Sequence, residues 1–282
     1  MEPKIIDGKA ISAAVKEEVR AEVDRLKTAG REVTLAVVLV GDDPASAVYV
    51  RNKKKACEAV GIRSLSYEMP ADTTQEKLLT CIAELNGRDD VDGILVQLPL
   101  PAGIDEQAVI RAIAPEKDVD GFHPVNVGLL AIGMPRVVSC TPAGVIEMLV
   151  RSGISIEGRE ALIIGRSNIV GKPLAHLMLQ HNATVTVAHS RTADLPAVAK
   201  RADILVAAIG RPRMIGPEYV KEGAVVIDVG INRDTATGKL CGDVDYDAVA
   251  PHVSAITPVP GGVGPMTIAM LMKNCVELSK MR

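Results

Sequence analysis

The sequence predicts an α/β protein of two domains, each built on a parallel sheet. Apolar runs rich in β-branched residues alternate with stretches of helical periodicity, in two separate blocks. The length of 282 residues also exceeds that of a usual single domain. Between the blocks the periodicity fades over 114–140, a length that compact domains rarely leave irregular. We therefore place the domains at 1–138 and 139–267, and we expect a final helix over about 268–282 to cross back to the first domain.

The first block begins with a helix, a strand and a second helix. The first helix ends at Gly30, and the apolar run at 34–40 follows as a strand. The second helix starts after Asp43, with Pro44 in its first turn, and ends at Gly61. This order is typical of the βα units of a parallel sheet. One face of the first helix is formed by Ile11, Val15, Val19, Val23 and Leu26.

A third helix and another strand complete the first block. Thr73 and Glu76 have the spacing of a capping box, which predicts a helix that opens at Thr73. The run at 93–101 has successive apolar residues, as in a strand covered on both faces, and prolines end it. Gln97 is therefore expected near the carboxyl edge of the sheet, where α/β proteins bind ligands.

The second block repeats the alternation and predicts a second doubly wound unit. A helix is expected from about 171, and a shorter one follows the second strand. Strands are expected over 161–165, 184–189, 203–210 and 224–232.

The end of the chain combines a loop with a helix. The segment 257–267 is rich in glycine and proline, which predicts a loop. The helix after it is the one that we expect to cross back to the first domain. Its apolar face is formed by Ile268, Leu271, Met272 and Val276.

The composition excludes several classes of protein. With 48% hydrophobic and 24% charged residues the chain is expected to fold, which excludes disordered and fibrous classes. The formal net charge is −3, with both signs interspersed, so we expect neither nucleic acid nor an anionic membrane as a partner. No apolar run approaches about 18 residues, the length that a membrane span needs.

Cysteine and histidine usage predicts a reducing compartment and no metal site. The five cysteines are scattered and form no C-x-x-C pair, which argues against disulfides and thiolate metal sites. The five histidines show no spacing typical of metal ligands, so no metal is proposed. Because the amino terminus also lacks the pattern of an export signal, we expect a cytoplasmic protein.

A candidate dinucleotide site lies where the strand at 161–165 meets the following helix. A pyrophosphate would bind there at the helix amino end. Compared with the usual G-x-G-x-x-G spacing, Ser167 and Val170 replace the second and third glycines, and Gly171 comes one residue late. A plain tight βα turn therefore stays open as an alternative.

The end of the next strand favours NADP as the cofactor. An NAD enzyme normally places a carboxylate there, on the ribose 2′-hydroxyl, but this chain has His189, Ser190 and Arg191. A hydroxyl and a guanidinium, with Arg166 from the first turn, would instead accommodate a 2′-phosphate. A solvated basic loop is the alternative.

Lys53 is the candidate catalytic residue of the first domain. It lies beside the predicted apolar stripe of the second helix, which includes Val48, Tyr49, Ala56 and Val60. Tyr49 precedes it by four residues, so the phenol and the ammonium are neighbours on the helix. A lysine in a partly dry cleft deprotonates more easily and can serve as a general acid or base. The alternative is a lysine that extends to water.

At this point the chain resembles a known family over nearly its whole length. It is similar to the bifunctional methylenetetrahydrofolate dehydrogenase/methenyltetrahydrofolate cyclohydrolases. The resemblance implies a homodimer whose first domain is the catalytic, folate-binding domain and whose second is a Rossmann-like NADP-binding domain, with both ligands in one cleft. The motifs that carry it lie at 40–62, 93–101, 115–128, 165–173, 228–232 and 257–267.

Roles for four residues follow from this resemblance. Lys53 is expected to be the catalytic lysine, and Gln97 its partner in tuning and orientation. Tyr49 is expected to stack on the folate rings, which is apt because the chain has no tryptophan and one phenylalanine. Asp120 is expected to accept hydrogen bonds from the pterin; an Asx turn before Gly121 is the alternative.

The resemblance also implies two sets of binding residues. Those expected to line the folate site are Ser46, Leu98, Pro260, Gly261 and Gly262. Those expected to contact NADP are Gly165, Arg166, Ser167, Ser190, Arg191 and Ile231, with Arg166 and Ser190 on the 2′-phosphate.

The implied reaction is oxidation of 5,10-methylenetetrahydrofolate with NADP, followed by hydrolysis of the methenyl product to 10-formyltetrahydrofolate. One alternative is a monofunctional dehydrogenase in which Lys53 only positions substrate. Another is a nucleotide-binding or scaffold protein without catalysis.

Overall fold

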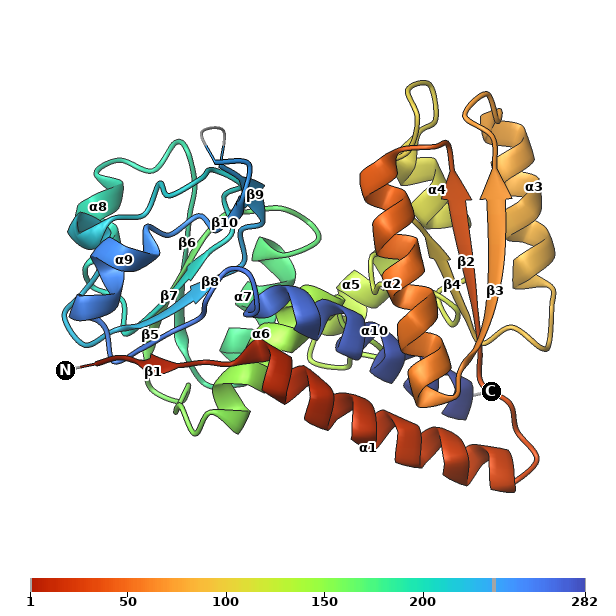
Figure 1. The fold of residues 1–282 in the computed structure, drawn as a ribbon, viewed down its shortest axis with the longest axis horizontal. Coiled ribbons are helices and arrows are strands. Elements are labelled where there is room, and N and C mark those ends of the chain that lie inside the picture. Colours follow the sequence, from red (N-terminus) through yellow and green to blue (C-terminus); the bar gives the residue numbers. More distant parts are fainter. Residues whose placement is uncertain (1, 235–236, 282) are drawn as a thin grey trace. The chain divides into compact units, whose positions relative to one another are not determined.

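The computed structural model describes residues 2–234 and 237–281. The chain divides into two compact units, labelled here unit 1 and unit 2, each with its own parallel sheet (Figure 1). Unit 1 comprises Met1–Ala13 and Ser139–Thr267, and unit 2 comprises Ala14–Val138 and Ile268–Arg282. The predicted two-domain α/β fold is confirmed. Residues 1–13, however, lie in unit 1 and not with the rest of 1–138.

Unit 2 is built on a three-stranded parallel sheet. The strand order is β3 (Arg63–Met69), β2 (Thr34–Val40), β4 (Gly93–Val96). Every residue of β2 and β4 is buried, as expected for strands covered on both faces. One face packs Ala36, Val38 and Val40 against the helices α3 (Gln75–Asn86) and α4 (Glu106–Ala112).

The helices of unit 2 begin and end where local chemistry dictates. In α2 (Pro44–Val60) the Asp43 carboxylate accepts a hydrogen bond from the Ser46 N–H at 2.7 Å, and Gly61 closes the helix at φ 81°. The capping residue of α3 is Thr74, whose hydroxyl accepts from the Lys77 N–H, so the predicted start at Thr73 was wrong by one residue. The first helix, α1, spans Gly8–Thr28.

A helix that the sequence did not predict lies within the aperiodic segment. It is α5 (Pro124–Ala131), and the imidazole of His123 caps it by accepting from the Val125 N–H. The buried carboxylate of Asp118 accepts hydrogen bonds from the His123 N–H and from Asn126 Nδ2, at 2.8 and 2.9 Å. These local hydrogen bonds order a segment whose sequence lacks helical periodicity.

Unit 1 contains a six-stranded parallel sheet with β6 at one edge. Its order is β1-β11-β8-β7-β5-β6. The strands are β1 (Lys4–Ile5), β5 (Glu160–Ile164), β6 (Thr184–Ala188), β7 (Ile204–Ala207), β8 (Val225–Asp228) and β11 (Ala255–Ile256), and a separate hairpin pairs β9 (Asn232–Arg233) with β10 (Leu240–Cys241). The helices are α6 (Cys140–Arg151), α7 (Gly171–Gln180), α8 (Leu195–Ala199) and α9 (Tyr246–Val249), with short 3-10 turns at Pro217–Tyr219 and Ala250–His252.

The last helix, α10 (Val263–Lys280), starts earlier than the predicted loop at 257–267 allowed. Its residues from Ile268 onward belong to unit 2, as expected for a helix that crosses back. Within unit 2, Asn274 Nδ2 donates to the carbonyl oxygens of Val119 and Val138 at 2.9 and 2.8 Å, which anchors the helix. Over the described residues, no helix has the length and apolar character to span a membrane.

Candidate functional sites

Lys53 lies in the middle of the buried face of α2. Ser46, Val50, Cys57 and Val60 are all buried, and with Lys53 they form one row at spacings of three and four residues. Lys53 itself is half-buried. The stem of the Lys53 side chain therefore lies on a buried face, and the ammonium at its end needs a polar partner.

The position of that buried row corrects the predicted stripe. Val48 and Tyr49 were expected on the apolar face, but they are 47% and 45% exposed. The buried face is rotated toward Val50 and Cys57, because these residues pack on the sheet and on α10, where Cys57 Sγ lies 3.5 Å from Met272 Sδ. An exposed Tyr49 keeps one ring surface available to a flat ligand.

Gln97 is the hydrogen-bond partner of Lys53. The ammonium donates to Gln97 Oε1 at 2.9 Å, and Gln97 Nε2 donates to the Leu98 carbonyl at 2.6 Å. The two bonds fix the orientation of the amide, because the oxygen must face the donor and the nitrogen the acceptor. Gln97 directly follows β4, which ends at Val96 and is shorter than the predicted run at 93–101. The sequence had placed it at this edge.

Asp120 lies close enough to Lys53 for their charges to interact. Burial raises the pKa of the Asp120 carboxyl to about 6; the Lys53 ammonium lowers it and Asp118 raises it further. The Asp120 carboxylate accepts no hydrogen bond from a described residue, whereas the Asp118 carboxylate accepts two. The structure thus brings Lys53, Gln97 and Asp120 together in unit 2, with a half-buried carboxylate that can accept ligand N–H groups.

Two further predicted residues lie beside these. The Ser46 side chain is buried on the same face of α2 as Lys53, in its first turn. Leu98 is half-buried and supplies the carbonyl that holds Gln97. Ser46 is therefore linked to Lys53 through the helix that they share, and Leu98 is linked to it through Gln97.

In unit 1, a large cavity lies at the carboxyl edge of the sheet. It has a volume of about 640 Å³ and is bordered by the residues that follow β5, β6 and β7. Small-molecule sites occupy about 300–1,000 Å³ and lie at this edge in doubly wound sheets. Of the predicted cofactor residues, those that line the cavity are Gly165, Arg166, Ser167 and Ser190.

The turn after β5 needs its glycines for close backbone packing. Gly165 has φ 135°, and a Cβ added there would lie 2.2 Å from the Ala208 carbonyl oxygen. A Cβ at Gly171, the first residue of α7, would lie 2.1 Å from the Gly165 oxygen. The Ser167 hydroxyl accepts from the Val170 N–H at 3.1 Å. The irregularly spaced glycines therefore form a tight turn at the amino end of a helix, which is the geometry that an anion site requires.

Two predicted cofactor residues do not line this cavity. Arg191 is exposed and its N–H donates to His189 Nδ1 at 3.1 Å, but it is not among the lining residues. Ile231 instead borders a second cavity of about 170 Å³, together with Pro260, Gly261 and Gly262. The sequence had assigned Ile231 to NADP and these three residues to folate, whereas the structure groups all four in unit 1.

The loop of this second cavity is held by tight backbone contacts. A Cβ added at Gly8 would lie 1.8 Å from the Gly262 oxygen, and the Lys9 N–H donates to the Gly261 oxygen at 3.1 Å. Lys9 also lines the cavity, and the sequence did not single it out.

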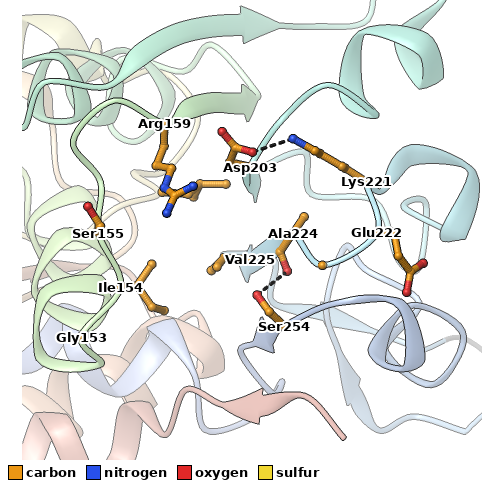
Figure 2. Close-up of a pocket in the computed structure, with 12 residues that line it drawn as sticks. Gly153, Ile154, Ser155, Arg159, Asp203, Lys221, Glu222, Ala224, Val225 and Ser254 are labelled. Carbon is orange, nitrogen blue, oxygen red and sulfur yellow. Dashed lines mark hydrogen bonds and ion pairs between the residues drawn. The ribbon is translucent and has the colours of Figure 1, made fainter. Parts of the chain in front are cut away.

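A third cavity in unit 1 lies at the opposite edge of the sheet. It has a volume of about 300 Å³ and includes Ile204 and Val225, the first residues of β7 and β8. Figure 2 shows Asp203 and Lys221 joined across one wall, at 2.7 Å. Because ligands of doubly wound sheets bind at the carboxyl edge, the cavity of about 640 Å³ is the better candidate for the cofactor.

The structure also reveals residues that sequence patterns did not indicate. Arg211 follows β7 and lines the cavity of about 640 Å³; its place at a carboxyl edge was the signal available. Asp243 is fully buried and accepts hydrogen bonds from the backbone after β7, a role with no local signal. Asp228 is its neighbour: burial raises the Asp228 pKa to about 6, although three backbone N–H groups oppose the shift.

Comparison with known proteins covers both units. Residues 6–120 match the description "Tetrahydrofolate dehydrogenase/cyclohydrolase, catalytic domain", and residues 139–282 match "Tetrahydrofolate dehydrogenase/cyclohydrolase, NAD(P)-binding domain". Bifunctional protein FolD of Lachnoclostridium phytofermentans is 66% identical over 276 residues, which cover 98% of each chain.

Solved structures agree. The crystal structure of the bifunctional enzyme FolD, a methylenetetrahydrofolate dehydrogenase/cyclohydrolase from Campylobacter jejuni, is 50% identical, covers 99% of both chains and has a TM-score of 0.97. The Trypanosoma brucei N5,N10-methylenetetrahydrofolate dehydrogenase-cyclohydrolase, complexed with NADP and an inhibitor, is 41% identical over 100% of this chain and 98% of its own, with a TM-score of 0.94. The resemblance predicted from the motifs is confirmed, and the chain belongs to the tetrahydrofolate dehydrogenase/cyclohydrolase family.

Proposed function

We propose that the chain oxidises 5,10-methylenetetrahydrofolate with NADP and then hydrolyses the resulting 5,10-methenyltetrahydrofolate to 10-formyltetrahydrofolate. The first reaction moves a hydride from the one-carbon bridge to the cofactor. The second consumes one water and releases one proton. The observation that carries the proposal is the ammonium of Lys53, held at 2.9 Å from Gln97 Oε1 on the buried face of α2 and within charge interaction of Asp120.

The folate is proposed to bind in unit 2 through complementary chemistry. Asp120 would accept N–H groups of the pterin, since its carboxylate lacks a hydrogen-bond donor among the described residues. The exposed ring of Tyr49 would stack on the pterin or the benzoyl ring. Ser46 and Leu98 would border the ligand from the first turn of α2 and from the end of β4.

NADP is proposed to bind in unit 1, and the residues present fit it. The cavity of about 640 Å³ lies beside a tight glycine turn that leads into the amino end of α7, where a pyrophosphate can bind. Arg166 and Ser190 supply the guanidinium and hydroxyl that suit a 2′-phosphate. When bound, the cofactor accepts the hydride at C4 of its nicotinamide ring.

The protein assists the oxidation mainly by orientation. Loss of hydride from the bridge is driven by the lone pairs of N5 and N10, so it needs little acid or base. Holding the bridge in reactive geometry can contribute about 7–11 kcal/mol. Pro260, Gly261, Gly262 and Ile231 share one cavity of unit 1 and are proposed to contact the reacting ends of the ligands.

Hydrolysis needs proton transfer, and here Lys53 is proposed to act. Water adds to the cationic methenyl carbon and loses a proton. The C–N5 bond then breaks as N5 takes up a proton and the hydroxyl on the carbon loses its own, which leaves the formyl C=O on N10 and releases one proton in total. Lys53 Nζ is proposed to exchange these protons, while Gln97 Oε1 holds the ammonium in position.

Two separate assays test this function. Methylenetetrahydrofolate with NADP should give rising NADPH absorbance, and supplied methenyltetrahydrofolate should be hydrolysed faster than in buffer. Oxidation without enzymatic hydrolysis would support a monofunctional dehydrogenase instead. Failure of both would support a binding protein without catalysis.

We also propose a homodimer formed through unit 1. Strand β6 is an edge of the six-stranded sheet, and Val187 on it is 38% exposed, while Leu179 at the end of α7 is 62% exposed. An exposed strand edge with apolar residues favours pairing with a second copy about a twofold axis. Sedimentation should show a dimer that Val187→Lys converts to monomer; a wild-type monomer at micromolar concentration would contradict the proposal.

We propose the cytoplasm as the compartment, since none of the five cysteines is joined in a disulfide. Fractionation of cells that express the tagged chain tests this, and recovery outside the cytoplasm would contradict it.

A further inference from the structure

We propose that Arg211 contacts the 2′-phosphate of the cofactor and contributes to the preference for NADP over NAD. The inference rests on the proposed function of the cavity of about 640 Å³ in unit 1. Neither the motifs of the sequence nor the family resemblance assigned a role to this residue.

Arg211 reaches the cavity from the end of β7, and Ser190 reaches it from the end of β6, on the other side of β5. In the sheet, β5 lies between β6 and β7, so the loops after these three strands meet at one edge. Ser190 follows β6, Arg166 follows β5 and Arg211 follows β7, and all three line the cavity. Arg211 therefore lines the same cavity from the side of β7, and under this proposal its long side chain extends across β5 to the phosphate.

The charges of the lining favour an anion. No aspartate or glutamate is among the described residues that line this cavity, whereas two arginines are. Arg211 forms no ion pair within the described part of the chain, while Arg213, two residues later, is paired with Asp234 at 3.1 Å. A phosphate monoester carries about −1.5 to −2 charges at pH 7, and an unpaired guanidinium is its natural partner.

The backbone of Arg211 is held in place by a buried carboxylate. Asp243 accepts hydrogen bonds from the N–H groups of Ile209, Gly210 and Arg211, at 2.6, 3.0 and 2.9 Å, and from Asn232 Nδ2 at 2.8 Å. Such a set of charge-assisted bonds fixes three successive residues. Because the Cα of Arg211 is fixed, only its side chain has to become ordered when the phosphate binds, which lowers the entropic cost.

The experiment is an equilibrium fluorescence titration with NADPH and with NADH, which requires no catalysis. We expect Arg211→Gln to weaken NADPH binding about tenfold, the effect of one exposed charge-assisted hydrogen bond, and to leave NADH binding unchanged. The loss should shrink at high salt, since the interaction is between exposed charges. Arg211→Lys should recover part of the affinity, because it restores the charge but not the bidentate geometry.

Matched controls separate a specific contact from a general change of charge. Arg213→Gln removes the same charge two residues away, at a side chain that does not line this cavity, and should leave both affinities unchanged. An equal loss for NADPH and NADH with Arg211→Gln, or no loss, would overturn the proposal. A chain that binds NADPH as expected but lacks both folate activities would contradict the proposed function and leave this inference standing.

Discussion

Replacement of Lys53 by methionine should separate the two proposed activities. The substitution removes the ammonium and keeps an unbranched side chain of similar length. Lysine and methionine have nearly equal helix propensity, and the side chain lies among Val50 and Cys57 on the buried face of α2. We therefore expect the stability of the fold to change by no more than about 1 kcal/mol.

The two activities should fall by different amounts. Hydrolysis loses its proposed acid and base, which is worth about 10²–10⁴-fold, or roughly 3–5 kcal/mol of transition-state free energy. Oxidation loses only the bond of 2.9 Å that holds Gln97 Oε1. A hydrogen bond to a charged group is worth about 1.5 kcal/mol at its lower end, so dehydrogenase activity should fall about tenfold.

Formation of 10-formyltetrahydrofolate from supplied methenyl substrate and the rate of NADPH formation measure the two activities independently. Lys54→Met is the control, because Lys54 lies on the exposed side of the same helix, and it should leave both rates unchanged. Equal loss of both activities by Lys53→Met in a folded protein would refute the proposed division of labour. So would retention of hydrolysis.

Two other substitutions test the cofactor turn and the carboxylate beside Lys53. Gly165→Ala should abolish NADPH binding and lower the free energy of unfolding in urea by about 2 kcal/mol or more, since its Cβ would lie 2.2 Å from the Ala208 oxygen. Gly158→Ala is the control: Gly158 also has a positive φ, 70°, but no atom lies within 4 Å of the added Cβ, so the free energy of unfolding should fall by only about 1 kcal/mol. Comparable losses at the two glycines would contradict the steric argument. Burial raises the pKa of the Asp120 carboxyl from 3.8 to about 6, so the folded chain binds more protons than the unfolded chain between these pH values. Protonation of Asp120 therefore stabilises the fold at low pH by at most about 3 kcal/mol, and this stabilisation is lost as the pH rises toward 6. Asp120→Asn should therefore gain stability relative to the wild type from pH 4 to pH 7, and a difference between the two proteins that does not vary with pH would exclude the raised pKa.

Local signals in the sequence predicted part of the framework, but not the strand β3 or the helices α4 and α6. Pro44 and Gly61 set the bounds of α2, and the uniformly apolar run at 34–40 is β2 as predicted. The helix α5 was not predicted, because its cap is the imidazole of His123, which is not a usual capping group, and the His123 N–H is held by the Asp118 carboxylate.

The candidate site could also be predicted in part from local sequence patterns. Gln97 was expected at a carboxyl edge, and the structure pairs it with Lys53. The exposure of Tyr49 was not foreseen, because helical periodicity fits two overlapping stripes and only packing chooses between them. Asp243 left no pattern, since three of its donors are backbone N–H groups more than thirty residues earlier in the chain.

Neither compact unit is made from one continuous stretch of chain. The short strand β1 supplies an edge of the sheet of unit 1 from the first residues, and the part of α10 from Ile268 onward completes unit 2 from the last. A ribosome must therefore release the chain through α10 before unit 2, most of which precedes most of unit 1 in the chain, can bury its core. A fragment ending near Val138 would lack Asn274 and Met272, and would leave apolar surface open to chaperones and proteases.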